Sequence, residues 1–126
     1  MADNDAPDPV RTAEKLEAVT RDLVLLTREV LRPSDSHLIL GSLTTAQESL
    51  AQVYVQLAEW HSQVVQGVHY AGEEETGSTG NAGWLRAELA LEEAARSGRA
   101  AAEALKRAHS ANGLASWFDE VRSDEL

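Results

Sequence analysis

The sequence predicts an all-α protein: an elongated three-helix bundle in which two long helices form an antiparallel hairpin, followed by a short C-terminal helix. Two observations predict this fold. Apolar and small residues recur at alternating spacings of three and four in three long segments, which is the pattern of helices that pack on helices. Prolines occur only at positions 7, 9 and 33, so long stretches lack the residue that most disrupts a helix interior.

The first helix is expected over residues 10–32. Residues 1–9 are acidic and are expected to form a disordered tail, which leaves residues 10–122 as a single helical domain. Pro9 suits the first position of a helix, and Pro33 ends the pattern. The seam of this helix is expected to consist of Leu16, Val19, Leu23, Leu26 and Val30.

The second helix is expected over residues 34–71. It either runs through Gly41 with a break there, or begins near Ser42, where Thr45 and Glu48 have the spacing of a capping box. Between Ser36 and Gly72 the only residues that carry a formal charge are Glu48 and Glu59. A helix with so little charge is usually covered on more than one side. We therefore expect it to be the central helix of the bundle or a subunit interface.

The third helix is expected over residues 83–111, after a mobile glycine-rich loop over 72–82. Trp84, Leu91, Gly98 and Leu105 recur every seventh residue, and an alanine follows each by three. An antiparallel hairpin would place Leu57 opposite Gly98 and large residues of the second helix opposite small residues of the third. The residues expected in this packing seam are Leu50, Val53, Leu57, Trp60, Val64, Trp84, Ala87, Leu91, Ala94, Gly98, Ala101, Leu105 and Ala108.

A short amphipathic helix is expected over residues 114–122. Its apolar residues are Trp117, Phe118 and Val121. The segment either folds back on the end of the bundle or serves as an exposed docking peptide, since aromatic residues are favoured anchors at interfaces.

The formal net charge of −10 argues against binding to nucleic acid or to an acidic membrane surface. No run of about 20 apolar residues, the length that a membrane span needs, is present. The N-terminal residues lack the apolar stretch of a signal peptide. With no cysteine in the chain, these features favour a cytoplasmic protein. The 20 alanines, and the nine arginines against two lysines, are typical of a GC-rich bacterial genome.

The histidines are the only residues that suggest chemistry. His61 and His109 lie beside the two long seams and are expected to meet across the hairpin. The Glu-x-x-His spacing of helical di-iron proteins does not occur, and no serine has an evident catalytic base. We therefore expect no catalytic residue, no metal site and no cofactor.

Two resemblances follow from local motifs. Residues 108–113, Ala-His-Ser-Ala-Asn-Gly after an alanine-rich helix, resemble uncharacterised small helical proteins of actinobacterial mobile elements, a likeness that implies no activity. Residues 70–74, Tyr-Ala-Gly-Glu-Glu, match the Tyr-x-x-x-Asp/Glu export signal, and the layout resembles the secreted Trp-x-Gly helical-hairpin family. The Trp-x-Gly motif itself is missing, because Trp84 is followed by Leu85 and Arg86.

The resulting functional hypothesis is a non-enzymatic interaction or scaffold protein that acts through helical packing and associates with itself, with a dimer favoured. The acidic surface also suits a basic protein partner. Two alternatives remain at this point: a secreted protein of the Trp-x-Gly type, as the resemblance implies, and an acidic inhibitor that mimics nucleic acid.

Overall fold

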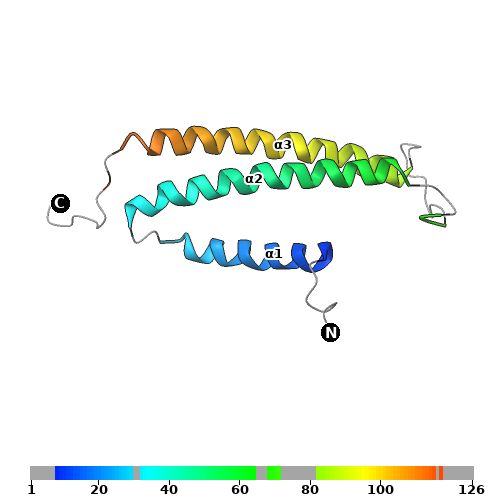
Figure 1. The fold of residues 1–126 in the computed structure, drawn as a ribbon, viewed down its shortest axis with the longest axis horizontal. Helices are drawn as coiled ribbons and strands as arrows, with labels where there is room; N and C mark the ends of the chain where they lie inside the picture. Colours follow the sequence, from blue (N-terminus) through cyan, green and yellow to red (C-terminus); the bar gives the residue numbers. More distant parts are fainter. Residues whose placement is uncertain (1–7, 30–31, 65–67, 72–81, 116, 118–126) are drawn as a thin grey trace. The chain divides into compact units, whose positions relative to one another are not determined.

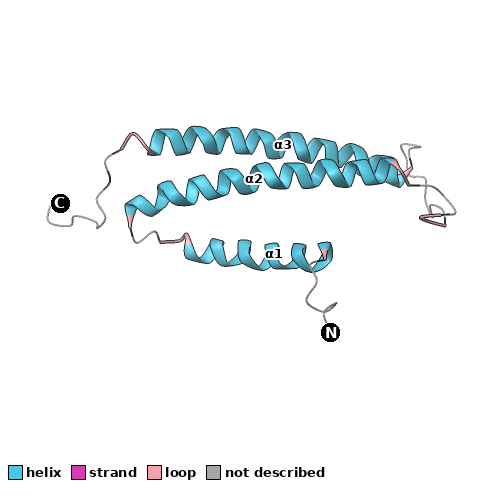
Figure 2. Ribbon diagram, in the orientation of Figure 1, coloured by secondary structure: helices cyan, strands magenta, loops and turns pink. Residues whose placement is uncertain are grey.

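A computed structural model describes residues 8–29, 32–64, 68–71, 82–115 and 117. It contains the helices α1 (Pro9–Leu26), α2 (Pro33–Ser62) and α3 (Gly83–Asn112), with no β-strand among the described residues (Figures 1 and 2). The all-α class and the antiparallel hairpin of the two long helices are confirmed. The chain divides into two compact units, one from Ser36 to Ser116 and one that contains α1, whereas a single helical domain was expected over 10–122.

Helix α1 begins at Pro9 because Asp8 caps it. The Asp8 Oδ1 accepts hydrogen bonds from the amides of Val10 at 2.9 Å and Arg11 at 3.1 Å, which satisfies two amides that have no partner within the helix. Pro9 therefore belongs to the helix and not to the expected tail; residues 1–7 lie outside the described residues.

The C-terminal end of α1 is at Leu26, six residues before the expected end at 32. The Thr27 hydroxyl donates to the carbonyl of Leu23 at 2.6 Å, and the amide of Arg28 donates to Leu25 at 3.4 Å. A bond from an amide to the carbonyl three residues back is typical of a final helical turn. No residue of α1 is buried, and Val30, expected in its seam, lies outside the described residues.

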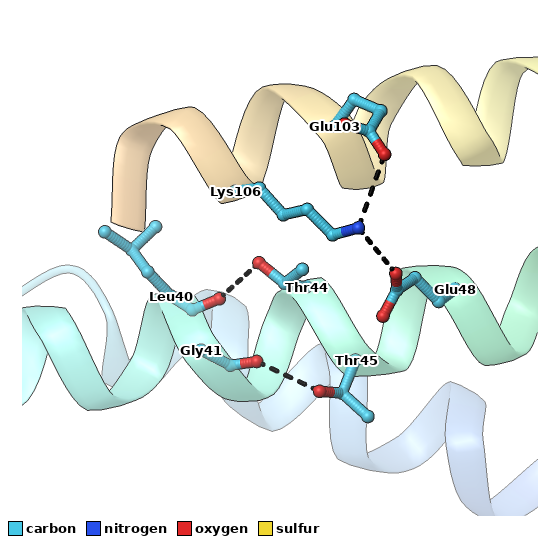
Figure 3. Close-up of polar contacts among 7 residues, drawn as sticks. All are labelled: Leu40, Gly41, Thr44, Thr45, Glu48, Glu103 and Lys106. Atoms are coloured by element: carbon cyan, nitrogen blue, oxygen red, sulfur yellow. Dashed lines mark hydrogen bonds and ion pairs between the residues drawn. The ribbon is translucent and has the colours of Figure 1, made fainter. Parts of the chain in front are cut away.

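Helix α2 is continuous through Gly41, so the break considered at that position is absent. The hydroxyls of Thr44 and Thr45 donate back to the carbonyls of Leu40 at 2.8 Å and Gly41 at 3.3 Å (Figure 3). Both threonines thereby lie inside the helix, and the capping box expected at Thr45 does not form a helix start.

Helix α2 ends at Ser62, nine residues before the expected end at 71. The Ser62 hydroxyl donates to the Glu59 carbonyl at 2.7 Å, and the amides of Gln63 and Val64 bond to carbonyls three residues back. Such bonds are typical of a final helical turn. Residues 65–67 and most of the expected loop, residues 72–81, lie outside the described residues.

Helix α3 matches the expected range of 83–111 to within one residue. It ends where the amide of Gly113 donates to the His109 carbonyl at 3.0 Å. Leu114 and Ala115 follow as a turn and a bend, and Trp117 is not helical. The short helix expected over 114–122 therefore does not begin at 114, and its remaining residues, Phe118 and Val121 included, lie outside the described residues.

The hairpin closes on small residues. In the part of the chain that the structure describes, the buried residues are Thr44, Ala51 and Ala58 from α2 and Ala95, Gly98 and Ala102 from α3. A Cβ atom added to Gly98 would lie 3.3 Å from the Cβ of Ala51, and one added to Gly41 would lie 3.3 Å from the His109 ring. These two contacts set the register of the hairpin.

The expected partner of Gly98 was therefore wrong: it is Ala51, not Leu57. Three large α2 residues expected in the seam are exposed instead, with exposed fractions of 45% for Val53, 45% for Leu57 and 53% for Trp60. Leu57 lies about 120° around the helix axis from Ala51. Small residues on both helices allow a closer approach than a row of leucines, and the closer approach brings more atoms into contact.

The α3 side of the expected seam does lie along α2. Leu91, Ala94, Ala101 and Leu105 are half-buried on either side of Gly98. Ala108, at the end of this row, is exposed. The structure thus keeps the expected contact face of α3 and replaces that of α2.

Candidate interaction surface

A row of leucines on α2 lies on the same side of the hairpin as a row of α3 alanines. Leu43, Leu50 and Leu57 each precede a buried residue of α2 by one position, and Ala94 and Ala101 precede buried residues of α3 in the same way. In an antiparallel pair of helices, the residue just before a contact residue points to the same side of the pair on both helices, because each residue is rotated by about 100° from the next. The two rows therefore form one surface.

We call this surface the open face. Its residues are Leu43, Leu50 and Leu57 of α2, with Ala94, Ser97, Ala101 and Ala108 of α3. None of these side chains carries a charge. The α2 row is large and the α3 row is small, so the face has a raised and a low half.

The opposite side of the hairpin is charged. The Lys106 Nζ lies 3.0 Å from a Glu48 carboxylate oxygen across the hairpin and 3.3 Å from Glu103 on its own helix (Figure 3). The hydrogen bond to Glu48, and next the one to Glu103, raises the pKa of Lys106 above its usual 10.5. Two hollows along this side, of about 390 and 240 Å³, are lined by charged residues that include Glu59, Glu88 and Arg99.

The sequence reasoning brought the wrong histidines together. His109 stacks on His37, with ring centroids 3.9 Å apart and an interplanar angle of 19°, and does not meet His61. The cause is the register, because His109 lies level with Gly41. The Nδ1 atom of His37 is buried without a hydrogen-bond partner.

His61 lies near the other end of the hairpin, where its Nδ1 is 2.8 Å from the Leu57 carbonyl. The ring of Trp60 meets the rings of His61 and His69 edge-on, at centroid distances of 4.9 and 6.1 Å. These residues, with Tyr70 and Trp84, line a hollow of about 280 Å³. Among the described residues no group of three or more histidines and carboxylates is placed to hold a metal ion.

The expected docking peptide is described only at Trp117, which is 47% exposed. The residues that the sequence reasoning missed are the buried ones of α2, Thr44, Ala51 and Ala58. Their seven-residue spacing is visible in the sequence, but it runs beside a row of leucines at the same spacing. Hydrophobicity alone favours the leucine row as the face of α2 that contacts α3.

Comparison of the chain with known protein families, with curated proteins and with solved structures finds no match. A search of the described residues for a helix that is both long and apolar enough to cross a membrane also finds none.

Proposed function

We propose that this protein is a non-enzymatic interaction protein that associates with itself through helical packing. The observation that supports the proposal most directly is the open face, where Leu57 is 45% exposed in line with Leu43 and Leu50 on an uncharged side of the hairpin. Contiguous exposed apolar surface of this kind commonly marks a site of protein association.

The size of the open face suits a weak, reversible contact. From Leu43 to Leu57 the helix rises about 21 Å, and two helices side by side are about 20 Å across. The footprint is therefore about 400 Å² on each partner, or about 800 Å² in total, which is the size of a weak, transient interface. Self-association through this face would cover the leucine side chains.

The experiment is analytical ultracentrifugation of the full chain over a wide range of protein concentrations. We expect a reversible dimer, because burial of the open face depends on concentration. Leu57→Glu would place a charge in the contact and should shift the protein to monomer. A strictly monomeric parent protein would contradict the proposal.

Leu89→Glu is the matched control. Leu89 is 50% exposed, close to the 45% of Leu57, but it lies on the side of α3 that points away from α2 and outside the open face. The same substitution at this site should leave the dimer intact. If both glutamate variants dissociate the dimer equally, the open face is not the contact.

A further inference from the structure

We propose that the open face binds a second copy of this chain across a two-fold axis parallel to the long axis of the hairpin. In this arrangement α2 of each copy packs on α3 of the other, and Leu50 lies opposite the partner's Ala101. The inference rests on the proposed function, self-association, and adds to it the pairing of helices and the register.

The charge distribution favours the open face as the place where two copies meet. Two chains that each carry a net charge of −10 repel one another. The open face is a side of the hairpin on which two copies approach with no carboxylate in the contact, because Glu48 and Glu59 lie on the charged side. The two hollows lined by charged residues then remain on the outside of the dimer, in water.

The shape of the open face favours packing of α2 of one copy on α3 of the other. Leu50 and Leu57 form the raised row, while Ala94 and Ala101 form the low row. A two-fold axis along the hairpin places the raised row of each copy over the low row of the other, so that all layers fill evenly. An axis perpendicular to the helices would place leucines on leucines and alanines on alanines, which leaves one seam crowded and the other loose.

The register then follows from symmetry. Rotation about an axis parallel to the helices does not change the level of a residue along the hairpin. Within one chain, Ala51 is level with Gly98 and Gly41 is level with His109. By this alignment, the positions of Leu50 and Ala101 along the hairpin axis differ by about 3 Å. The pairs Leu57 with Ala94 and Leu43 with Ala108 differ by the same distance. Three leucine–alanine layers therefore repeat along each half of the interface.

Disulfide trapping tests this arrangement cleanly because the chain contains no cysteine. Leu50→Cys and Ala101→Cys are prepared as separate full-length proteins, one with a mass tag, and are mixed, exchanged by unfolding and refolding, and oxidised. Disulfides require Cα atoms within about 7 Å. We expect a mixed disulfide between the two variants as the main cross-linked product, and the same result for Leu57→Cys with Ala94→Cys.

Two controls share the chemistry but not the geometry. Leu57→Cys is also mixed with Ala108→Cys. These two positions are two heptads out of register in the proposed dimer, so little mixed disulfide should form. Leu50→Cys alone should give little homodimer, because the two α2 helices lie diagonally across the proposed bundle.

The outcomes separate the two proposals. A chain that stays monomeric in ultracentrifugation contradicts both. A dimer in which Leu50→Cys links mainly to itself, or in which the mismatched pair links as well as the matched pair, contradicts this arrangement and leaves self-association standing. A dimer that cross-links only in the matched pairs supports both.

Discussion

Gly98→Ala adds one methyl group at the closest approach between α2 and α3. The new Cβ would lie 3.3 Å from the Cβ of Ala51 and 3.6 Å from its Cα. Carbon atoms attract one another best at about 3.5–4.0 Å, and a helix backbone cannot turn aside as a side-chain tip can. The two helices must therefore move apart by a few tenths of an ångström to admit the methyl group.

Two opposing effects set the magnitude. Helix propensity favours alanine over glycine by about 1 kcal/mol in a helix interior. Against this, a small separation removes about a quarter of the attraction of each contact across the seam, and some tens of contacts of about 0.1–0.2 kcal/mol each together lose about 1 kcal/mol. We expect Gly98→Ala to be no more stable than the parent protein.

Gly41→Ala is the matched control, since Gly41 also lies inside a helix. Its added Cβ would lie 3.3 Å from the Nε2 of His109, which is the end of a side chain and can shift. In Gly41→Ala the higher helix propensity of alanine should therefore stabilise the protein, and the melting temperature should rise by about 4–8 °C for a gain of about 1 kcal/mol. Thermal melts by circular dichroism, at one protein concentration, compare the three proteins. Equal stabilisation by both alanines would refute the reasoning about the small-residue seam.

The other predictions concern the ion pair, the helix cap and the seam. The hydrogen bonds to Glu48 and Glu103 raise the pKa of Lys106, so the contribution of this ion pair to stability is complete below pH 10.5 and is lost as the pH rises through the raised pKa. At neutral pH the melting temperature of Lys106→Met should lie below that of the parent protein. The two melting temperatures should become equal as the pH rises through the raised pKa. Asp8→Ala removes the cap of α1 and should destabilise that helix by about 1 kcal/mol, measured as faster hydrogen exchange at the amides of Val10 and Arg11. Ala51→Leu should destabilise the hairpin by about 1–3 kcal/mol through overpacking, whereas Ala100→Leu, at an exposed position of α3, should change the free energy of unfolding by less than about 0.5 kcal/mol.

The helical class and the limits of α3 were predictable because seven-residue periodicity and a terminal glycine are local signals. The contact face of α2 was not. That helix carries a leucine row at 43, 50 and 57 beside a small row at 44, 51 and 58, and periodicity predicts both equally. Which row meets α3 depends on how closely the two backbones approach, a property of the pair of helices. The ends of α1 at Leu26 and of α2 at Ser62 come before the apolar spacing stops, so this spacing does not reveal them.

The buried apolar residues of the described hairpin are four alanines, and this has a consequence for how its stability responds to solvent and temperature. The heat-capacity change of unfolding and the sensitivity to urea both scale with the apolar surface that unfolding exposes. A single hairpin closed on methyl groups exposes little new apolar surface, so its transition should be broad and its stability curve shallow. Docking of a second copy would bury the leucine row as well, and the same chain would then unfold with a sharper transition and a larger heat-capacity change.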